Sequence, residues 1–90
     1  MKIVINTCFG GFGLSYIACD EIIRRGGTDD DLWDISRTNP ILVAMVEEDS
    51  ELYSGNFAQL KVVEIPDDVE WEISDYDGQE HIAEKHRRWY

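Results

Sequence analysis

The stretch that decides the fold is residues 1–15, MKIVINTCFGGFGLS. An apolar run predicts a strand over residues 2–7, and Gly10, Gly11 and Gly13 follow it in a loop. A helical pattern begins directly after this loop. Glycines at such a junction let the backbone adopt positive φ and bring bare N–H groups close to a ligand. Because the N-terminus of the following helix adds further unpaired N–H groups, the stretch is typical of an anion site, most often for phosphate.

Apolar periodicity and turn residues predict the remaining elements. Helices are expected at residues 15–25, 40–53 and 79–89, and strands at residues 32–36, 60–65 and 69–75. Gly26 ends the first helix, Asn39 caps the second, and Asp77-Gly78 forms a tight turn. The order β-α-β-α-β-β-α predicts an α/β fold, a small single-domain sandwich over residues 1–90. The adjacent strands 60–65 and 69–75 are expected to pair as a C-terminal β-hairpin, followed by the last helix.

Composition narrows the classes of function. A hydrophobic fraction of 43% predicts a folded globule rather than a disordered chain. Nineteen acidic against eight basic residues give a net charge of −11, which disfavours direct binding of nucleic acid but leaves open imitation of DNA. Cys8 and Cys19 are too few for a disulfide framework, and no apolar run could span a membrane. Without a signal peptide at the start, the expected location is the cytoplasm.

The glycine loop fits no nucleotide-binding signature in full. No Gly-Lys-Ser/Thr follows it, as a Walker A loop requires, and Tyr16 stands where GxGxxG needs its last glycine. One interpretation is an anion site in which Phe9 and Phe12 flank the backbone donors and stack on a base. The other is a tight strand-to-helix turn, in which the glycines relieve steric strain and the two rings fill the core.

Isolated cations provide a second feature of an otherwise acidic chain. Arg37 precedes the second helix, and Lys85, Arg87 and Arg88 cluster beside Trp89 at the C-terminus. Arginine forks suit phosphate and a neighbouring aromatic ring suits a nucleobase. The alternative is that the terminal cations only complement a helix dipole. If Arg37 and the C-terminal cations converge on the glycine loop, the site is a phosphate pocket.

Metal binding and catalysis receive little support from the sequence. His81 and His86 are five residues apart and do not share one helical face, and residues 75–80 lack the oxygen ligands of a calcium loop. No nucleophile elbow or acid–base spacing involves Ser15 or Cys8. We therefore expect no metal, no cofactor and no catalytic residues, and an enzyme is not indicated.

Three segments in order resemble a family of small bacteriophage and prophage proteins. They are KIVINTCFGGFGLS, RTNPILV and LKVVEIPDDVEWEISDYDGQEHIAEKHR, and they cover more than half of the chain. The chain is shorter than some members between its first helix and Arg37, which puts the strand at residues 32–36 in doubt. The family has no established catalytic residues to transfer. The resemblance implies expression in an infected bacterial host, where small phage proteins with glycine-lined anion pockets resemble oligomeric counter-defence sponges that sequester nucleotide immune signals.

The sequence supports three functional hypotheses. The first is a non-catalytic binder of a phosphorylated small molecule, acting as a homo-oligomer because self-association enlarges a small core. The second is an acidic module or DNA mimic that binds a basic host protein, and the third is a small nucleotide hydrolase. The ligand-binding residues expected under the first are Phe9, Gly10, Gly11, Phe12, Gly13, Ser15, Arg37, Lys85, Arg87, Arg88 and Trp89. The carboxylates expected to act under the second are Glu47, Glu48, Asp49, Glu51, Glu70 and Glu72.

Overall fold

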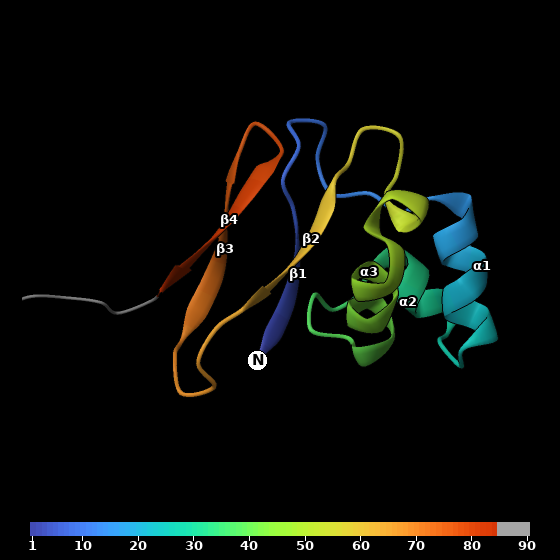
Figure 1. Ribbon diagram of the computed structural model, residues 1–90, viewed down its shortest axis with the longest axis horizontal. Coiled ribbons are helices and arrows are strands. Elements are labelled where there is room, and N and C mark those ends of the chain that lie inside the picture. The colour runs from blue at the N-terminus through green and yellow to red at the C-terminus, as the bar shows by residue number, and fades with distance from the viewer. Residues whose placement is uncertain (85–90) are drawn as a thin grey trace, which may run out of the picture.

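The computed structural model describes residues 1–84, which form four strands and three helices (Figure 1). In chain order these are β1 (Lys2–Asn6), α1 (Tyr16–Arg24), α2 (Asp29–Trp33), α3 (Pro40–Tyr53), β2 (Leu60–Glu64), β3 (Trp71–Tyr76) and β4 (Gln79–Glu84). The fold is thus a small mixed α/β arrangement, although the order of elements differs from the one expected. No helix within these 84 residues combines the length and apolar character needed to cross a bilayer.

The strands form two separate antiparallel sheets. β1 pairs with β2, so that Val4 lies opposite Val62, and β3 pairs with β4, so that Ile73 lies opposite Ile82. The three helices lie on one side of the β1–β2 sheet, with α3 packed directly on both strands, and the β3–β4 hairpin lies on the other side (Figure 1). The first strand is therefore enclosed between helices and hairpin.

Burial on both faces explains the sequence of β1. Ile3, Val4, Ile5 and Asn6 are all buried, whereas a strand with one wet face would alternate apolar and polar residues. Val4 belongs to the helical core, and the alternation of side chains along a strand directs Ile3 and Ile5 to the face nearer the hairpin. The buried members of the helical core are Val4, Ala18, Ile22, Ile35, Leu42, Val43, Met45, Val46, Tyr53 and Leu60.

Both long helices begin and end at residues that the sequence marks. The Ser15 hydroxyl accepts a hydrogen bond from the amide of Ala18 at 3.0 Å, which caps α1. The Asn39 side chain accepts one from Ile41 at 2.8 Å, and Pro40 occupies the first turn of α3. Gly26 follows α1 with a φ of 101°, a conformation that glycine adopts without strain. The structure confirms these helix boundaries.

The strand expected at residues 32–36 is wrong, because Leu32 and Trp33 belong to the short helix α2 and residues 34–36 form neither helix nor strand. The Asp31 carboxylate accepts a hydrogen bond from the Thr28 amide at 2.9 Å, as the residue at the third position does in a capping box. Three aspartates in the first turn also complement the positive end of the helix. The Thr-Asp-Asp-Asp sequence is thus a helix start, and its apolar neighbours do not make a strand.

The expected strand pairing and the final helix are also wrong. β2 pairs with β1, and β3 pairs with β4, which occupies residues 79–84 in place of the expected helix. Asp77 and Gly78 have φ values of 55° and 92°, so they form the two-residue turn that favours a hairpin. The tight turn itself is as expected, but the segments on its two sides pair with each other. The remainder of the expected helix, residues 85–89, lies outside the described residues.

Helix α3 contains a break at Asp49. This residue has φ −162° and ψ 87°, and its carboxylate accepts a hydrogen bond from the amide of Leu52 at 3.1 Å. Asp49 therefore acts as an N-cap for a last, redirected turn. The acidic residues near the end of α3, which oppose the dipole of an unbroken helix, are partly explained by this new helix start.

Candidate functional site: a glycine-lined cleft

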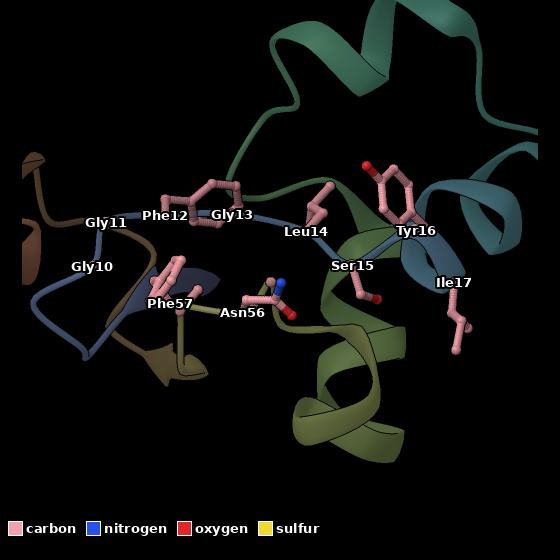
Figure 2. Close-up of a pocket in the computed structure, with 12 residues that line it drawn as sticks. Gly10, Gly11, Phe12, Gly13, Leu14, Ser15, Tyr16, Ile17, Asn56 and Phe57 are labelled. Atoms are coloured by element: carbon pink, nitrogen blue, oxygen red, sulfur yellow. The ribbon is translucent and has the colours of Figure 1, made fainter.

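The glycine loop and the start of α1 form one wall of a cleft of about 580 Å³. The segment after α3 forms the other wall, where Asn56 and Phe57 face the loop (Figure 2). The lining contains no acidic or basic side chain, which is unusual on a chain of net charge −11. The lining residues are Gly10, Gly11, Phe12, Gly13, Leu14, Ser15, Tyr16, Ile17, Gly55, Asn56, Phe57 and Ala58.

The structural reason for a glycine differs among the three loop positions. A Cβ at Gly10 would lie 1.9 Å from the carbonyl oxygen of Phe57, so the two walls of the cleft touch there only because the side chain is missing. Gly11 has a φ of 90°, which an L side chain rarely adopts. At Gly13 a Cβ would meet nothing within 4 Å. Close packing and backbone conformation thus account for two glycines, and the third leaves open space in the cleft.

Several backbone donors of this wall remain without an acceptor. The amides of Gly11, Phe12 and Gly13 donate no hydrogen bond within residues 1–84. The first-turn amides of Tyr16 and Ile17 are also open, because the Ser15 cap reaches only Ala18. Within the described residues, these amides between the strand and its helix are therefore open to an acceptor from outside the chain.

Ser15 lines the cleft, but its polar groups are already engaged. Its hydroxyl donates to the carbonyl of Leu52 at 2.8 Å while accepting from Ala18, and its amide donates to the carbonyl of Tyr53 at 3.1 Å. The redirected last turn of α3 presents these two carbonyls. Ser15 therefore joins α1 to α3, and its hydroxyl lacks the freedom of a nucleophile.

Arg37 lies behind the loop and is not part of the cleft lining. Its guanidinium forms a two-pronged ion pair with Glu80, at 2.6 and 2.9 Å, and stacks 3.7 Å from the centre of the Phe12 ring. Sequence reasoning placed Arg37 on a ligand phosphate. The charge is instead matched by a carboxylate that is almost fully buried, and the aromatic contact is a cation–π interaction that holds Phe12 in place.

Asn6 completes this buried network and joins the hairpin to the loop. Its amide donates to Glu80 at 2.8 Å, and its side chain donates to the carbonyls of Cys8 and Gly78 at 2.6 and 2.7 Å. The Asn6 side-chain oxygen accepts from Gln59 at 2.8 Å. We call Asn6, Arg37 and Glu80 the latch. No buried side-chain polar atom among residues 1–84 lacks a partner, so the latch is fully satisfied.

The latch also fixes the position of the loop. A Cβ on Gly78 would lie 2.4 Å from the carbonyl oxygen of Phe9 and 2.6 Å from the amide nitrogen of Gly11, so the hairpin turn rests directly on the loop backbone. Sequence reasoning missed Asn6 and Glu80. The available signals were a polar residue at the end of an apolar strand and the Asp-Gly turn next to Glu80.

Burial and pairing act in opposite directions on the Glu80 carboxyl. Burial alone would raise its pKa, but the hydrogen bonds from Arg37 and from the Asn6 amide outweigh burial and hold the pKa below its ordinary value. Glu80 is therefore ionised at neutral pH. Its charge is compensated within the protein, and it contributes no free negative charge to the nearby cleft.

A second cleft, of about 420 Å³, lies on the other side of residues 12–14. Arg37 lines this second cleft together with Trp33 and Asp34, and Phe12 borders both clefts. Residues 12–14 line both clefts, so the cavity that Arg37 lines shares part of the glycine loop with the first cleft. Arg37 is absent from the lining of the first cleft, and its expected convergence with Lys85, Arg87 and Arg88 stays a prediction, because these three residues lie outside the described part of the chain.

The other expected site residues fall into two groups. Phe9 is 59% exposed and does not line the main cleft, and Lys85, Arg87, Arg88 and Trp89 lie outside the described residues. Asn56 and Phe57, which line the cleft, were not expected. The only sequence signal for them is a large aromatic residue directly after Gly55-Asn56, a pair typical of turns.

Two of the carboxylates expected to imitate DNA have partners within the protein. Glu47 pairs with Lys2 at 2.9 Å and Glu48 pairs with Arg25 at 2.8 Å. Among residues 1–84, no group of three His, Cys, Asp or Glu side chains is placed to hold a metal ion. The DNA-mimic hypothesis stays a prediction, with part of its proposed charge neutralised.

Comparison with known proteins gives no match to a family model, to a curated protein or to a solved structure. The resemblance to small phage proteins therefore stays a prediction based on the three segments of sequence. A functional assignment rests on the geometry of the cleft.

Proposed function

We propose that the glycine-lined cleft binds a small molecule that carries both a planar ring and a phosphate, as nucleotides do, without transforming it. The observation that carries this proposal is the pairing of open main-chain amides on one wall with an exposed aromatic ring on the other. Backbone amides at a loop and a helix N-terminus suit phosphate oxygens. The cleft volume of about 580 Å³ is within the range of small-molecule sites.

Phe57 is the residue we assign to the planar ring. The residue is 76% exposed and lies on the wall that faces the open amides, so its ring is accessible to a ligand in the cleft. The adjacent Asn56 side-chain amide has no hydrogen-bond partner within the described chain and offers both a donor and an acceptor to the edge of a base. Aromatic stacking of a base contributes about 1–3 kcal/mol.

The lining favours binding over catalysis. Apart from the Tyr16 phenol, no titratable side chain of the described residues lines the cleft, and the Ser15 hydroxyl is held by Leu52 and Ala18. General acid–base chemistry needs a titratable group within hydrogen-bonding reach of the ligand. In the phage setting that the sequence resemblance implies, such a binder would sequester a nucleotide signal of the host.

The proposal predicts a particular dependence of ligand affinity on salt concentration. Neutral amides supply the local attraction, whereas the net charge of −11 repels an anion at long range. Added salt screens this repulsion over a Debye length of about 10 Å at 0.1 M. We therefore expect affinity to rise with ionic strength. If the cations of residues 85–90 held the phosphate instead, affinity would fall.

The proposal is tested by calorimetric titration of the 90-residue chain with a panel of cyclic dinucleotides and cyclic ADP-ribose isomers. We expect one of these to bind, to bind more tightly at higher salt, and to be recovered unchanged after the protein is denatured. Phe57→Ala should weaken binding at least about 5-fold, in line with the loss of about 1–3 kcal/mol of stacking.

Tyr76→Ala is the matched control, because Tyr76 is similarly exposed, at 74%, and lines neither cleft. Equal losses in the two variants would contradict the assignment of Phe57. Absence of binding by every member of the panel at high protein concentration would remove the nucleotide class. Recovery of a hydrolysed ligand would replace the binder with an enzyme.

A further inference from the structure

In the β3–β4 hairpin, the backbone edge of β3 has no hydrogen-bond partner elsewhere in the described chain. The anchors of the hairpin to the body are the latch at Glu80, a hydrogen bond from Gln79 to the Thr7 carbonyl at 3.3 Å, and the Trp71 indole against the Met1 sulfur at 3.1 Å. From residue 72 to residue 76, β3 bonds only with its own hairpin. Two-stranded sheets are marginal in water, and three or more strands are usually needed.

The turn geometry shows which backbone groups of β3 are open. In a two-residue hairpin turn the flanking pair, here Tyr76 and Gln79, exchanges hydrogen bonds, and bonded pairs then alternate along the ladder. Pairs 74–81 and 72–83 are therefore bonded. The N–H and C=O groups of residues 71, 73 and 75 point away from β4, and within residues 1–84 none of them has a partner.

We propose that this edge pairs with the same edge of a second copy of the chain, antiparallel, about a twofold axis at Ile73. This register uses all three open residues, because Ile73 meets Ile73 and each Trp71 meets Asp75 of the other copy. Six backbone hydrogen bonds would join the two hairpins into one four-stranded sheet. Ile82 lies beside Ile73 in each hairpin, so the sheet would carry a continuous apolar stripe across the axis.

Side-chain charges select this register over its neighbours. With the axis at Ile73, Glu72 of each copy lies opposite Ser74 of the other. A shift of the axis to residue 72 sets two Glu72 carboxylates directly opposite each other, which is destabilising. A shift to residue 74 places Trp71 opposite Asp77, which lies in the turn, and so loses one bonded pair at each end. The proposal does not depend on what the glycine-lined cleft binds.

Ionic strength distinguishes this dimer from other associations. Two chains of charge −11 repel each other, so a dimer joined by backbone bonds and apolar contacts should tighten as salt is added. An association in which the basic residues 85–90 bind the acidic body of another copy should weaken. The two modes therefore respond to salt with opposite signs.

The test is sedimentation equilibrium of the 90-residue chain at several concentrations and salt levels. We expect a monomer–dimer equilibrium that shifts toward the dimer with salt. Ser74→Lys places a cation opposite each Glu72 and should tighten the dimer roughly 2- to 30-fold, since each of the two symmetric pairs contributes a cross-strand term. Ser74→Glu should weaken it by a similar factor. Ser74 is exposed and no hydrogen bond within the described chain involves its side chain, so both variants should fold.

Gln59→Lys and Gln59→Glu are the controls, because Gln59 is also exposed and lies in the segment before β2 rather than in the hairpin. Equal effects at positions 59 and 74 would show a response to net charge alone and overturn the register. A monomer at millimolar concentration in high salt, or a dimer that salt weakens, would overturn the dimer. If the Ser74 variants fail to fold, amide exchange of residues 71, 73 and 75 in the native chain decides. Protection that increases with protein concentration supports the pairing, and constant exchange overturns it.

Discussion

At the scale of single residues, a side chain would be excluded at two of the three loop glycines and tolerated at the third. Gly10 is in contact with the Phe57 backbone, Gly11 adopts a positive φ, and Gly13 has an empty volume where a side chain would stand. Within four positions, glycine thus permits close packing at Gly10, permits a positive φ at Gly11 and leaves the cleft open at Gly13. A count of glycines in the sequence does not distinguish these three roles.

We expect Gly10→Ala and Gly13→Ala to differ strongly in stability. The first forces a methyl group to within 1.9 Å of a backbone carbonyl, which a small side-chain rotation cannot relieve, so it should cost about 2 kcal/mol or more. The second enters open space and should change the free energy of unfolding by less than about 1 kcal/mol. Urea unfolding followed by circular dichroism measures both. Similar losses in the two variants would show that the loop does not pack as described.

The latch predicts a pH dependence with a definite sign. Because the folded state lowers the pKa of Glu80, the stabilisation is fully present above the unfolded pKa of about 4.3 and is lost as pH falls through the folded value. Glu80→Gln should therefore cost about 1.5–3 kcal/mol at pH 7, the contribution of hydrogen bonds to a charged group. The difference from the native chain should shrink toward zero in acid.

Unfolding in urea at pH 7 and at pH 3 checks this expectation. Asp75→Asn provides a comparison, because Asp75 lies across the ladder from Glu80 but is exposed and bonds only the Gly78 amide. A difference between native and Glu80→Gln chains that persists unchanged in acid would contradict the role assigned to the ionised carboxylate.

At the scale of elements, the hairpin is attached to the rest of the described fold less extensively than the long helix α3 is. Within the described chain it is held by the latch, by the packing of the Gly78 turn on the loop and by two further side-chain contacts, whereas α3 packs along both β1 and β2. Regions with few buried contacts open locally at a lower free energy than the core. Weakening the latch should therefore release the hairpin before the helices unfold.

Hydrogen exchange read by mass spectrometry tests this order of opening. In Glu80→Gln we expect faster exchange in β3, β4 and the glycine loop, since Gly78 rests on Phe9 and Gly11, and unchanged exchange in α3. Uniform acceleration across the chain would indicate that hairpin and helices open together. In that case the latch would stabilise the whole fold rather than one element.

The elements differ in how far the sequence determines them. Ser15, Asn39 and Gly26 mark helix ends through local chemistry, and those ends are confirmed. Residues 32–36 depart from the expected strand because the capping interaction of Thr28 and Asp31 starts a helix that includes Leu32 and Trp33. The strand pairing of β1 with β2 joins residues about sixty positions apart. Local patterns do not encode that distance, and they favour pairing of the nearest strands instead.

In the candidate site too, local features can be predicted from the sequence and long-range contacts cannot. The open amides of the loop result from a strand, glycines and a helix in succession, and these are local features. The engagement of Arg37 by Glu80 depends on a hairpin folding back over β1, and the Asp-Gly turn marks the hairpin in the sequence but not the strand that it covers. Phe57 reaches the cleft for a similar reason, because the chain returns beside the loop after α3.

At the scale of the whole molecule, the negative charges greatly outnumber the positive charges that could neutralise them. Nineteen acidic and eight basic residues leave a net charge of −11, and the exposed ion pairs, such as Lys2 with Glu47, contribute little to stability. Self-repulsion of this kind destabilises a compact state and is screened by salt.

We therefore expect the melting temperature to rise as sodium chloride increases from low concentration to 0.5 M, where the Debye length falls to about 4 Å. Differential scanning fluorimetry at a fixed protein concentration measures the shift, and a low concentration keeps self-association from contributing. A melting temperature that falls with salt would show that the ion pairs outweigh the general repulsion.

The separation of Asn6 and Glu80 by 74 positions has a consequence for biosynthesis. Ribosomes add about 5–20 residues per second, so the carboxylate that Asn6 binds is made roughly 4–15 s after Asn6 itself. Until then the face of the first strand that the hairpin covers stays exposed, and the branched apolar side chains of Ile3 and Ile5 are available to chaperones or to other nascent chains. Synonymous codons that slow translation between these positions would lengthen that interval and lower the yield of folded protein, without altering a single amino acid.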